Sequence, residues 1–302
     1  MRILITGGSG LIGRALGGGL TNDGHEVIIL SRHPERVVAL PPGMRVERWD
    51  AHTLGEWGSL VDGADAIVNL AGENIAAGRW TRERKRRICE SRLNAGRAVV
   101  QAIESVTRKP RALIQASGVG YYGPCGDNDV TEDSPAGKDF LAQLAVEWES
   151  STFGVEALGV RRATIRTGVV LSNQGGALPR MLLPFRLFLG GRLGDGKQWF
   201  PWVHVVDEVG AIRFLIDNEV ASGPFNLAAP NPVTNADFSR MVGQQLKRRA
   251  FMPTPAFLLR LLFGEMATVL LDGQRAIPRR LMQAGYIFRF TDAASALQDI
   301  RA

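Results

Sequence analysis

The chain opens with the stretch Met1-Arg-Ile-Leu-Ile-Thr-Gly-Gly-Ser-Gly-Leu-Ile-Gly13, and this stretch decides the fold. Arg2 to Thr6 is a short apolar run with β-branched residues, which is the pattern of a buried strand. Glycines follow at positions 7, 10 and 13, and a helical pattern begins among them. A glycine-rich turn between a strand and a helix is typical of dinucleotide-binding folds.

Each glycine of this turn has an expected role. Gly7 lets the chain turn sharply off the strand, Gly10 lets the backbone approach a pyrophosphate, and Gly13 lets the helix pack closely on the sheet. The N–H groups at the start of the helix favour the phosphates. The alternative is a tight turn that binds no ligand. The predicted cofactor contacts in this turn are Gly7, Ser9, Gly10, Leu11, Ile12 and Gly13.

The end of the second predicted strand, residues 25–30, indicates which nicotinamide cofactor binds. An NAD site places Asp or Glu about 20 residues past the glycines, where the carboxylate binds the ribose 2′-hydroxyl. Here Ser31 and Arg32 follow the strand instead. The planar guanidinium of Arg32 suits a 2′-phosphate, and Ser31 adds a hydroxyl donor. We therefore predict NADP(H); the alternative is that Arg32 is a solvated loop charge.

The composition is that of an ordinary globular protein. The 302 residues are 45% hydrophobic and 22% charged, with a net charge of +6 that favours anionic ligands. Two cysteines, Cys89 and Cys125, are too few for a disulfide framework and lack metal-ligand spacing, so we expect no metal and a reducing, cytoplasmic location. No leader pattern and no long apolar run is seen, so we expect no membrane partner.

A basic run lies between positions 79 and 97. A nucleic-acid-binding protein could use such a run of basic residues to contact phosphates. The interleaved Glu83 and Glu90 and the apolar stripe through Ile88 and Leu93 favour a helix with one solvated basic face, so we expect no nucleic-acid partner. Arg92 is expected to face the cofactor phosphates. The basic residues are Arg79, Arg82, Arg84, Lys85, Arg86, Arg87, Arg92 and Arg97.

The turn at Thr6 to Gly13 resembles the opening of the extended short-chain dehydrogenase/reductase superfamily, which holds the nucleotide-sugar epimerases and dehydratases. The tail, Pro253 to Met266 and Gly273 to Leu281, is similar to that of the atypical "epimerase family proteins". The resemblance implies that Asp50 lies near the adenine. It also implies that the small-residue turn after residues 64–70 passes under the cofactor, through Leu70, Ala71, Gly72 and Glu73.

One departure from the superfamily pattern concerns catalysis. Standard members carry Tyr-x-x-x-Lys at the start of the helix expected here over residues 139–152, and the Tyr exchanges a proton with the substrate. Phe140-Leu-Ala-Gln-Leu144 stands in that place. The resemblance leaves Ser117, after the strand at 112–116, to hydrogen-bond the substrate oxygen, and Tyr122 as a candidate for proton transfer. The alternative for Tyr122 is a packed aromatic side chain; Glu73 with a water is a further candidate donor.

We predict an α/β fold with a doubly wound parallel sheet (Rossmann) and a smaller, discontinuous C-terminal substrate-binding domain. Residues 1–171 plus about 200–222 would bind NADP, and residues 172–199 plus about 223–302 would bind the substrate. The predicted function is an NADP(H)-binding oxidoreductase or nucleotide-sugar-epimerase-like enzyme, whose substrate is a carbonyl compound or a nucleotide sugar. The alternative is an NADP(H) sensor without turnover. The helices near 79–106 and 139–152 could form a homodimer.

Overall fold

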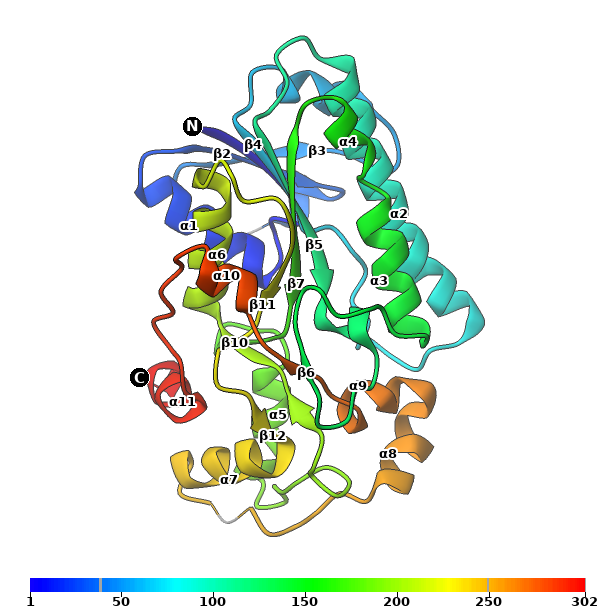
Figure 1. Cartoon of the computed structure of the whole chain (residues 1–302), viewed down its shortest axis with the longest axis vertical. Helices are drawn as coiled ribbons and strands as arrows, with labels where there is room; N and C mark the ends of the chain where they lie inside the picture. The colour runs from blue at the N-terminus through cyan, green and yellow to red at the C-terminus, as the bar shows by residue number, and fades with distance from the viewer. Residues whose placement is uncertain (38–39, 249, 302) are drawn as a thin grey trace.

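The computed structural model describes residues 1–37, 40–248 and 250–301. Its centre is a seven-stranded sheet in the order β3-β2-β1-β4-β5-β7-β11, with every neighbouring pair parallel (Figure 1). This confirms the predicted doubly wound parallel sheet. The strands are β1 Arg2–Thr6, β2 Glu26–Ser31, β3 Met44–Arg48, β4 Ala66–Asn69, β5 Ala112–Gly118, β7 Arg161–Thr167 and β11 Gly223–Leu227.

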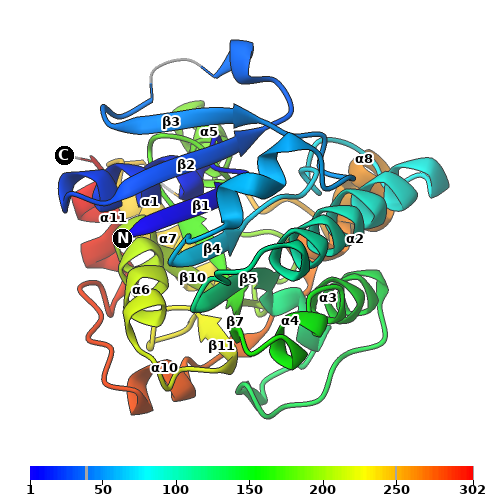
Figure 2. The ribbon, with the colours of Figure 1, turned by 90° about the horizontal axis from the view of Figure 1, so that it is seen from above.

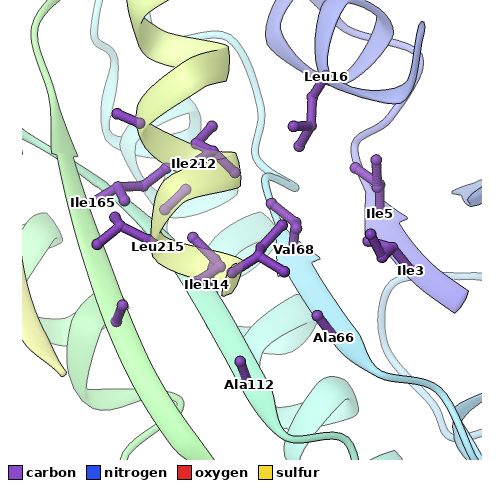
Figure 3. Packing of buried hydrophobic residues seen from close by; sticks show 14 of the residues in the cluster. Ile3, Ile5, Leu16, Ala66, Val68, Ala112, Ile114, Ile165, Ile212 and Leu215 are labelled. Atoms are coloured by element: carbon purple, nitrogen blue, oxygen red, sulfur yellow. The ribbon is translucent and has the colours of Figure 1, made fainter. Parts of the chain in front are cut away.

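Helices cover both faces of the sheet (Figure 2). On one face lie α1 Leu11–Asn22 and α6 Val205–Asp217, and on the other lie α2 Arg82–Ser105, α3 Phe140–Ser150 and α4 Gly154–Ala157. The strands are apolar on both sides because both faces are covered. Figure 3 shows the core beneath α1 and α6, where Leu16, Ile114 and Leu215 are fully buried. Within the described ranges, no helix is both long and apolar enough to cross a membrane.

Three consecutive glycines, at positions 17 to 19, lie in the middle of α1, where each would weaken an isolated helix by roughly 1 kcal/mol relative to alanine. The structure gives a reason for them. A Cβ atom on Gly17 would lie 2.5 Å from Sδ of Met44 on β3, and one on Gly18 would lie 3.1 Å from Pro41. Close packing against the β3 segment therefore favours small residues at positions 17 and 18. The helix ends at Asn22.

The stretch 163–171 has the pattern of one strand in the sequence, but the structure divides it between two sheets. The chain leaves the central sheet at Gly168, where a Cβ atom would lie 2.5 Å from the carbonyl oxygen of Pro201. Strand β8, Val169–Leu171, then pairs with β10, Trp202–His204, in a separate two-stranded sheet. This break carries the chain over the carboxyl ends of the strands, where it forms one wall of a cavity.

The remaining elements form the C-terminal part of the molecule, with a core that contains Phe185, Trp202, Phe238 and Phe290. Strand β11 returns to the central sheet beside β7, so the sheet extends past the predicted limit near residue 222. The rest of the predicted domain division stays a prediction. The other elements are β6 Asp129–Val130, α5 Leu178–Arg186, β9 Trp199–Phe200, β12 Val233–Thr234, α7 Asn235–Gln245, α8 Ala256–Phe263, α9 Thr268–Leu271, β13 Arg275–Ala276, α10 Arg279–Gln283 and α11 Ala293–Arg301.

Candidate functional site

The turn between β1 and α1 is shaped by two glycines and left open by a third. Gly7 has φ +65°, and a Cβ atom there would lie 2.8 Å from the Leu70 carbonyl oxygen. On Gly13 a Cβ atom would lie 2.4 Å from Cα of Gly8, so both positions need glycine for the fold itself. Gly10 is exposed, and the single neighbour of its Cβ position among the described residues is the Gly7 carbonyl oxygen at 3.3 Å.

The space over Gly10 is therefore free for a ligand. Gly10 is the N-cap of α1 and no side chain caps the helix, so the first N–H groups of α1 point at this space without a side-chain acceptor. A helix N-terminus of this kind favours an anion. Of the other predicted contacts in the turn, Ser9 is exposed, Leu11 is half-buried and Ile12 lines a cavity at the ends of the strands.

A buried polar chain fixes the strand ends beside this turn. Thr6 Oγ1 donates to Asn69 Oδ1 at 2.6 Å, and Asn69 Nδ2 donates to Gln115 Oε1 at 2.8 Å. All three side chains are fully buried, and they tie β1, β4 and β5 together. The sequence analysis missed this chain. The sequence feature that could have indicated these hydrogen bonds is a polar residue in the carboxyl-terminal half of each of three apolar strands.

A first cavity of about 450 Å³ lies at the ends of β2 and β3 and contains Arg32, Trp49, Asp50 and Trp57 in its walls. Arg32 is exposed, and its guanidinium makes no ion pair with any described residue. The Trp49 and Trp57 rings, 5.4 Å apart at their centroids, supply an aromatic wall. The cavity thus offers a free cation next to a surface that suits a planar base.

Two other residues predicted at this end of the sheet, Asp50 and Ser31, use their side chains in hydrogen bonds within their own loops. The Asp50 carboxylate accepts from the Thr53 hydroxyl at 2.6 Å and from the backbone N–H groups of His52 and Thr53. These hydrogen bonds, that of the Thr53 hydroxyl first, lower the pKa of Asp50 to about 2. Ser31 is buried, and its Oγ accepts from the His33 N–H at 3.2 Å. Asp50 lines the cavity, but its carboxylate is already used.

A second cavity, of about 620 Å³, lies at the carboxyl ends of β4, β5 and β7 and is roofed by the C-terminal part of the chain. This is the place where doubly wound sheets bind ligands. Leu70, Arg92 and Ser117 line it, and so bring predicted residues together. Most other walls are apolar, and include Leu141, Leu144, Met181, Trp199, Phe200 and Leu270.

Helix α3 presents to this cavity a face that is apolar apart from the indole N–H of Trp148. The residues that line it are Leu141, Leu144, Ala145 and Trp148. Phe140 instead packs against Trp80, with ring centroids 5.0 Å apart. Leu144 therefore faces the cavity as expected from the sequence, but Phe140 does not, and the pair one helical turn apart that lines the cavity is Leu141 and Ala145. None of these side chains can exchange a proton.

Ser117 connects the cavity to a buried ion pair. Its Oγ donates to Glu149 Oε1 at 2.7 Å, and Glu149 is held by two hydrogen bonds from Arg166, at 2.9 Å to Oε1 and 3.0 Å to Oε2. All three residues are buried. Neither Glu149 nor Arg166 was predicted from the sequence, because both lie in segments with several other polar residues.

Tyr122 lies on the far side of this ion pair. Its hydroxyl donates to Asn226 Oδ1 at 2.6 Å and accepts from Arg166 Nη1 at 3.1 Å. Burial raises the pKa of Tyr122 to about 12, and the residue is not among those that line the cavity. The geometry argues against the predicted proton transfer and favours the alternative of a packed, hydrogen-bonded aromatic residue.

The four residues after β4 that were predicted to contact the cofactor lie in different surroundings. Leu70 lines the second cavity, while Ala71 is buried next to Gly7. Gly72 lies against Arg92, since a Cβ atom there would be 3.0 Å from Cζ of the guanidinium. The Glu73 carboxylate is turned to the surface, where it pairs with two arginines of α2. Glu73 is therefore a poor candidate for a proton donor in the cavity.

The basic run of α2 is largely used within the molecule. Lys85 pairs with Glu265, Arg84 and Arg87 pair with Glu73, and Arg86 pairs with Glu90. Arg79 donates to backbone carbonyl oxygens of α8. The run therefore lies on a helix as predicted, but part of its basic face contacts the C-terminal part of the same chain instead of water.

A buried carboxyl group, Glu208, lies behind the cavity wall. It accepts from Thr167 Oγ1 at 2.8 Å, and burial raises its pKa from 4.5 to about 8. Between these values the folded state binds the proton more tightly than the unfolded state, so its contribution to stability falls as the pH rises. We predict that Glu208→Gln raises the free energy of unfolding above about pH 8 by a few kcal/mol, and has little effect below pH 4.5.

Urea denaturation over this pH range measures the Glu208 effect. The exposed Glu219→Gln, whose partner Arg111 is 3.7 Å away at the surface, serves as the control and should leave the pH dependence unchanged. If the free energies of unfolding of Glu208→Gln and the wild type differed by the same amount at every pH, the prediction would be contradicted.

Comparison with known proteins places this geometry in a family. Residues 3–228 match the model of the NAD dependent epimerase/dehydratase family, and residues 254–300 match a domain of unknown function (DUF1731). The chain is 39% identical over 303 residues to the epimerase family protein YfhF of Bacillus subtilis, covering 100% of this chain and 98% of that protein. It is 39% identical over 306 residues to the human epimerase family protein SDR39U1, covering 100% of both.

Solved structures agree with this relationship. The crystal structure of human SDR39U1 (isoform 2) with NADPH has a TM-score of 0.88 and 37% identity, and 99% of each chain is covered. A nucleoside-diphosphate sugar epimerase from Corynebacterium glutamicum has a TM-score of 0.79 and 36% identity, covering 98% of this chain and 57% of that one. The turn, the parallel sheet and these matches together show that the chain belongs to the NAD-dependent epimerase/dehydratase family.

Proposed function

We propose that the protein is an NADP(H)-dependent oxidoreductase that acts on a small carbonyl compound or the corresponding alcohol. The observation that carries this proposal is the arrangement of three features along one edge of the sheet. The free guanidinium of Arg32 lies past β2, the open N-terminus of α1 follows β1, and the cavity with Ser117 lies past β4 and β5. The NADPH in the human relative supports the choice of cofactor.

The described residues fit this cofactor. The N–H groups of α1 above Gly10 would hold the pyrophosphate, and Arg32 would pair with the 2′-phosphate. Trp49 and Trp57 offer a surface for the adenine. Leu70 and the apolar face of α3 would then border the nicotinamide.

When bound, the cofactor supplies or accepts the hydride. Ser117 transfers the proton, because the residue lines the cavity and its Oγ donates a hydrogen bond to Glu149. In the oxidising direction, Ser117 Oγ takes the proton of the substrate hydroxyl while its own proton passes to Glu149 Oε1. In the reducing direction, both transfers are reversed. Arg166 holds Glu149 in position by its two hydrogen bonds.

The test of the proposal begins with the purified protein. Native mass spectrometry identifies any nucleotide that co-purifies, and titration of the stripped protein compares NADPH with NADH. The loss of NADPH absorbance is then followed with aliphatic and aromatic carbonyl compounds and with nucleotide sugars. We expect selective NADPH binding and oxidation by a carbonyl compound. Binding without oxidation by any compound would favour the sensor, and no binding of either cofactor would overturn the proposal.

Arg32 provides the first mutational prediction. We expect Arg32→Ala to weaken NADPH binding by roughly tenfold or more and to leave NADH binding almost unchanged, because only NADPH carries the 2′-phosphate. Fluorescence titration measures both affinities. Arg45→Ala is the matched control, since Arg45 pairs with Glu47 on β3 outside the cavity. Equal losses for NADPH and NADH would show that Arg32 does not contact the 2′-phosphate.

Two further expectations stay predictions. The homodimer would form through α2 and α3, and the cytoplasmic location rests on two cysteines that are both free thiols. Neither is needed for the chemistry proposed above.

A further inference from the structure

The guanidinium of Arg92 is buried, and only one of its three nitrogen atoms donates hydrogen bonds to described residues. The residue is 8% exposed and lines the second cavity. Its Nη1 donates to the carbonyl oxygens of Glu73 at 3.0 Å and Ile88 at 3.1 Å. Nε is buried and finds no hydrogen-bond partner among the described residues, and Nη2 makes no hydrogen bond there either. One whole edge of the guanidinium, from Nε to Nη2, is therefore unused.

Arg92 also forms no ion pair with any described carboxylate. Its neighbour Glu73 directs its carboxylate to Arg84 and Arg87, both at 3.2 Å, and no other described carboxylate forms an ion pair with Arg92. Burial lowers the pKa of Arg92 to about 10, although the negative charge of Glu73 acts in the opposite direction. A buried charge of this kind is unfavourable unless a ligand supplies the opposite charge.

A second unused donor lies beside it. Cζ of Arg92 is 4.7 Å from the ring centroid of Trp148, and Nε1 of Trp148 is likewise buried without a partner among the described residues. Both side chains line the same cavity, and both can only donate hydrogen bonds. A group that satisfies them must bring oxygen acceptors and, for the guanidinium, a negative charge.

The order of the strands separates this position from the cofactor phosphates. The turn that would hold the pyrophosphate follows β1, whereas Arg92 lies beside Gly72, after β4, and Ser117, at the end of β5. Neighbouring strands are about 4.8 Å apart, so the two places differ by one to two strand spacings. The pyrophosphate also has the N–H groups of α1 as partners. This argues against the phosphate contact that the sequence analysis expected for Arg92.

We propose that Arg92 and Trp148 bind a carboxylate of the substrate, and that the substrate is a carboxylic acid with an apolar body. The Nε–Nη2 edge of Arg92 has the spacing that binds two carboxylate oxygens at once. Beyond it the cavity continues between apolar side chains such as Leu141, Met181 and Phe200. The inference rests on the proposed function, because it takes the rest of the cleft to hold the cofactor.

The test measures binding and needs no turnover. The protein, saturated with NADP⁺, is titrated by calorimetry with 3-phenylpropanoate and with its neutral amide, 3-phenylpropanamide. We expect the wild type to bind the acid about tenfold to a hundredfold more tightly than the amide, the range of a charge-assisted hydrogen bond. Arg92→Met should abolish this difference, and Arg92→Lys should restore part of it. Arg180→Met, at the second and exposed arginine of the cavity wall, should change acid binding by less than about twofold.

Three results would overturn the inference. The first is a wild type that binds the acid and the amide equally, and the second is an Arg92→Met variant that still binds the acid more tightly. The third is a loss of NADP⁺ affinity in Arg92→Met as large as its loss of affinity for the acid. The last would assign Arg92 to the cofactor. The affinity of each variant for NADP⁺ also reports whether it is folded. If the wild type binds no NADP⁺, the proposed function fails, and the same titrations on the protein without cofactor still decide the carboxylate site.

Discussion

Gly10→Val is expected to weaken the binding of NADPH and NADH alike by roughly a hundredfold or more, because its side chain occupies the place of the pyrophosphate. The fold should survive the change. Gly10 has φ −77° and ψ 177°, an extended conformation that valine adopts readily, and its Cβ atom would meet only the Gly7 carbonyl oxygen at 3.3 Å among the described residues. We expect a loss of no more than about 1 kcal/mol in the free energy of unfolding.

Two matched variants separate binding from folding at this turn. Gly78→Val is the control, because no atom of a described residue other than its chain neighbours lies within 4 Å of its Cβ position, so the change should affect neither property. Gly13→Val should fail to fold, since its Cβ would lie 2.4 Å from Cα of Gly8. Fluorescence titration and thermal melting measure the two properties. Normal cofactor binding by folded Gly10→Val would remove the turn from the proposed site.

Arg166→Met is expected to lower the free energy of unfolding by about 3–5 kcal/mol, because it leaves the Glu149 carboxylate buried without its counter-charge. The side chains of Arg166 and Glu149 are 4% and 11% exposed, so water cannot replace the lost partner. Arg166 also donates to Tyr122, whose hydroxyl would lose one of its two hydrogen bonds. Denaturation in guanidinium chloride measures the loss.

The double variant Arg166→Met with Glu149→Gln tests the cause of this loss. Removing both charges should recover part of the stability, because the penalty comes from the unpaired charge. The control is Arg108→Met, which breaks an exposed pair with Asp62 of similar length, 2.8 Å, and should cost at most about 1 kcal/mol. A loss for Arg166→Met no larger than that of the control would show that the buried ion pair contributes little to stability.

The same buried pair shows how far the sequence can be read for catalysis. The absence of Tyr-x-x-x-Lys is visible in the chain, because Phe140 and Leu144 stand at the start of the expected helix where those two residues would be. What replaces it is not visible. Glu149 lies 32 positions from Ser117, and only the packing of α3 against β5 brings its carboxylate to 2.7 Å from the Ser117 hydroxyl.

Tyr122 illustrates the opposite error. Its position after β5 made it a plausible proton donor in the sequence, since Ser117 lies five residues before it. The short 3-10 helix Val119–Tyr122 turns its ring into the core, where Asn226 and Arg166 hold the hydroxyl. A residue's distance along the chain from a site carries no information on which way a turn directs its side chain.

The sequence by itself determined the sheet, the glycine turn and the family, because these depend on local patterns. An apolar strand, glycines at fixed spacing and a helix start are all encoded within thirteen residues, and the alternating strands and helices repeat the same unit. The tertiary structure alone decided which side chains face the cleft. Arg92, Trp148 and Ser117 come from α2, α3 and β5, and their meeting depends on helix rotation and burial, which are set by packing across the whole molecule.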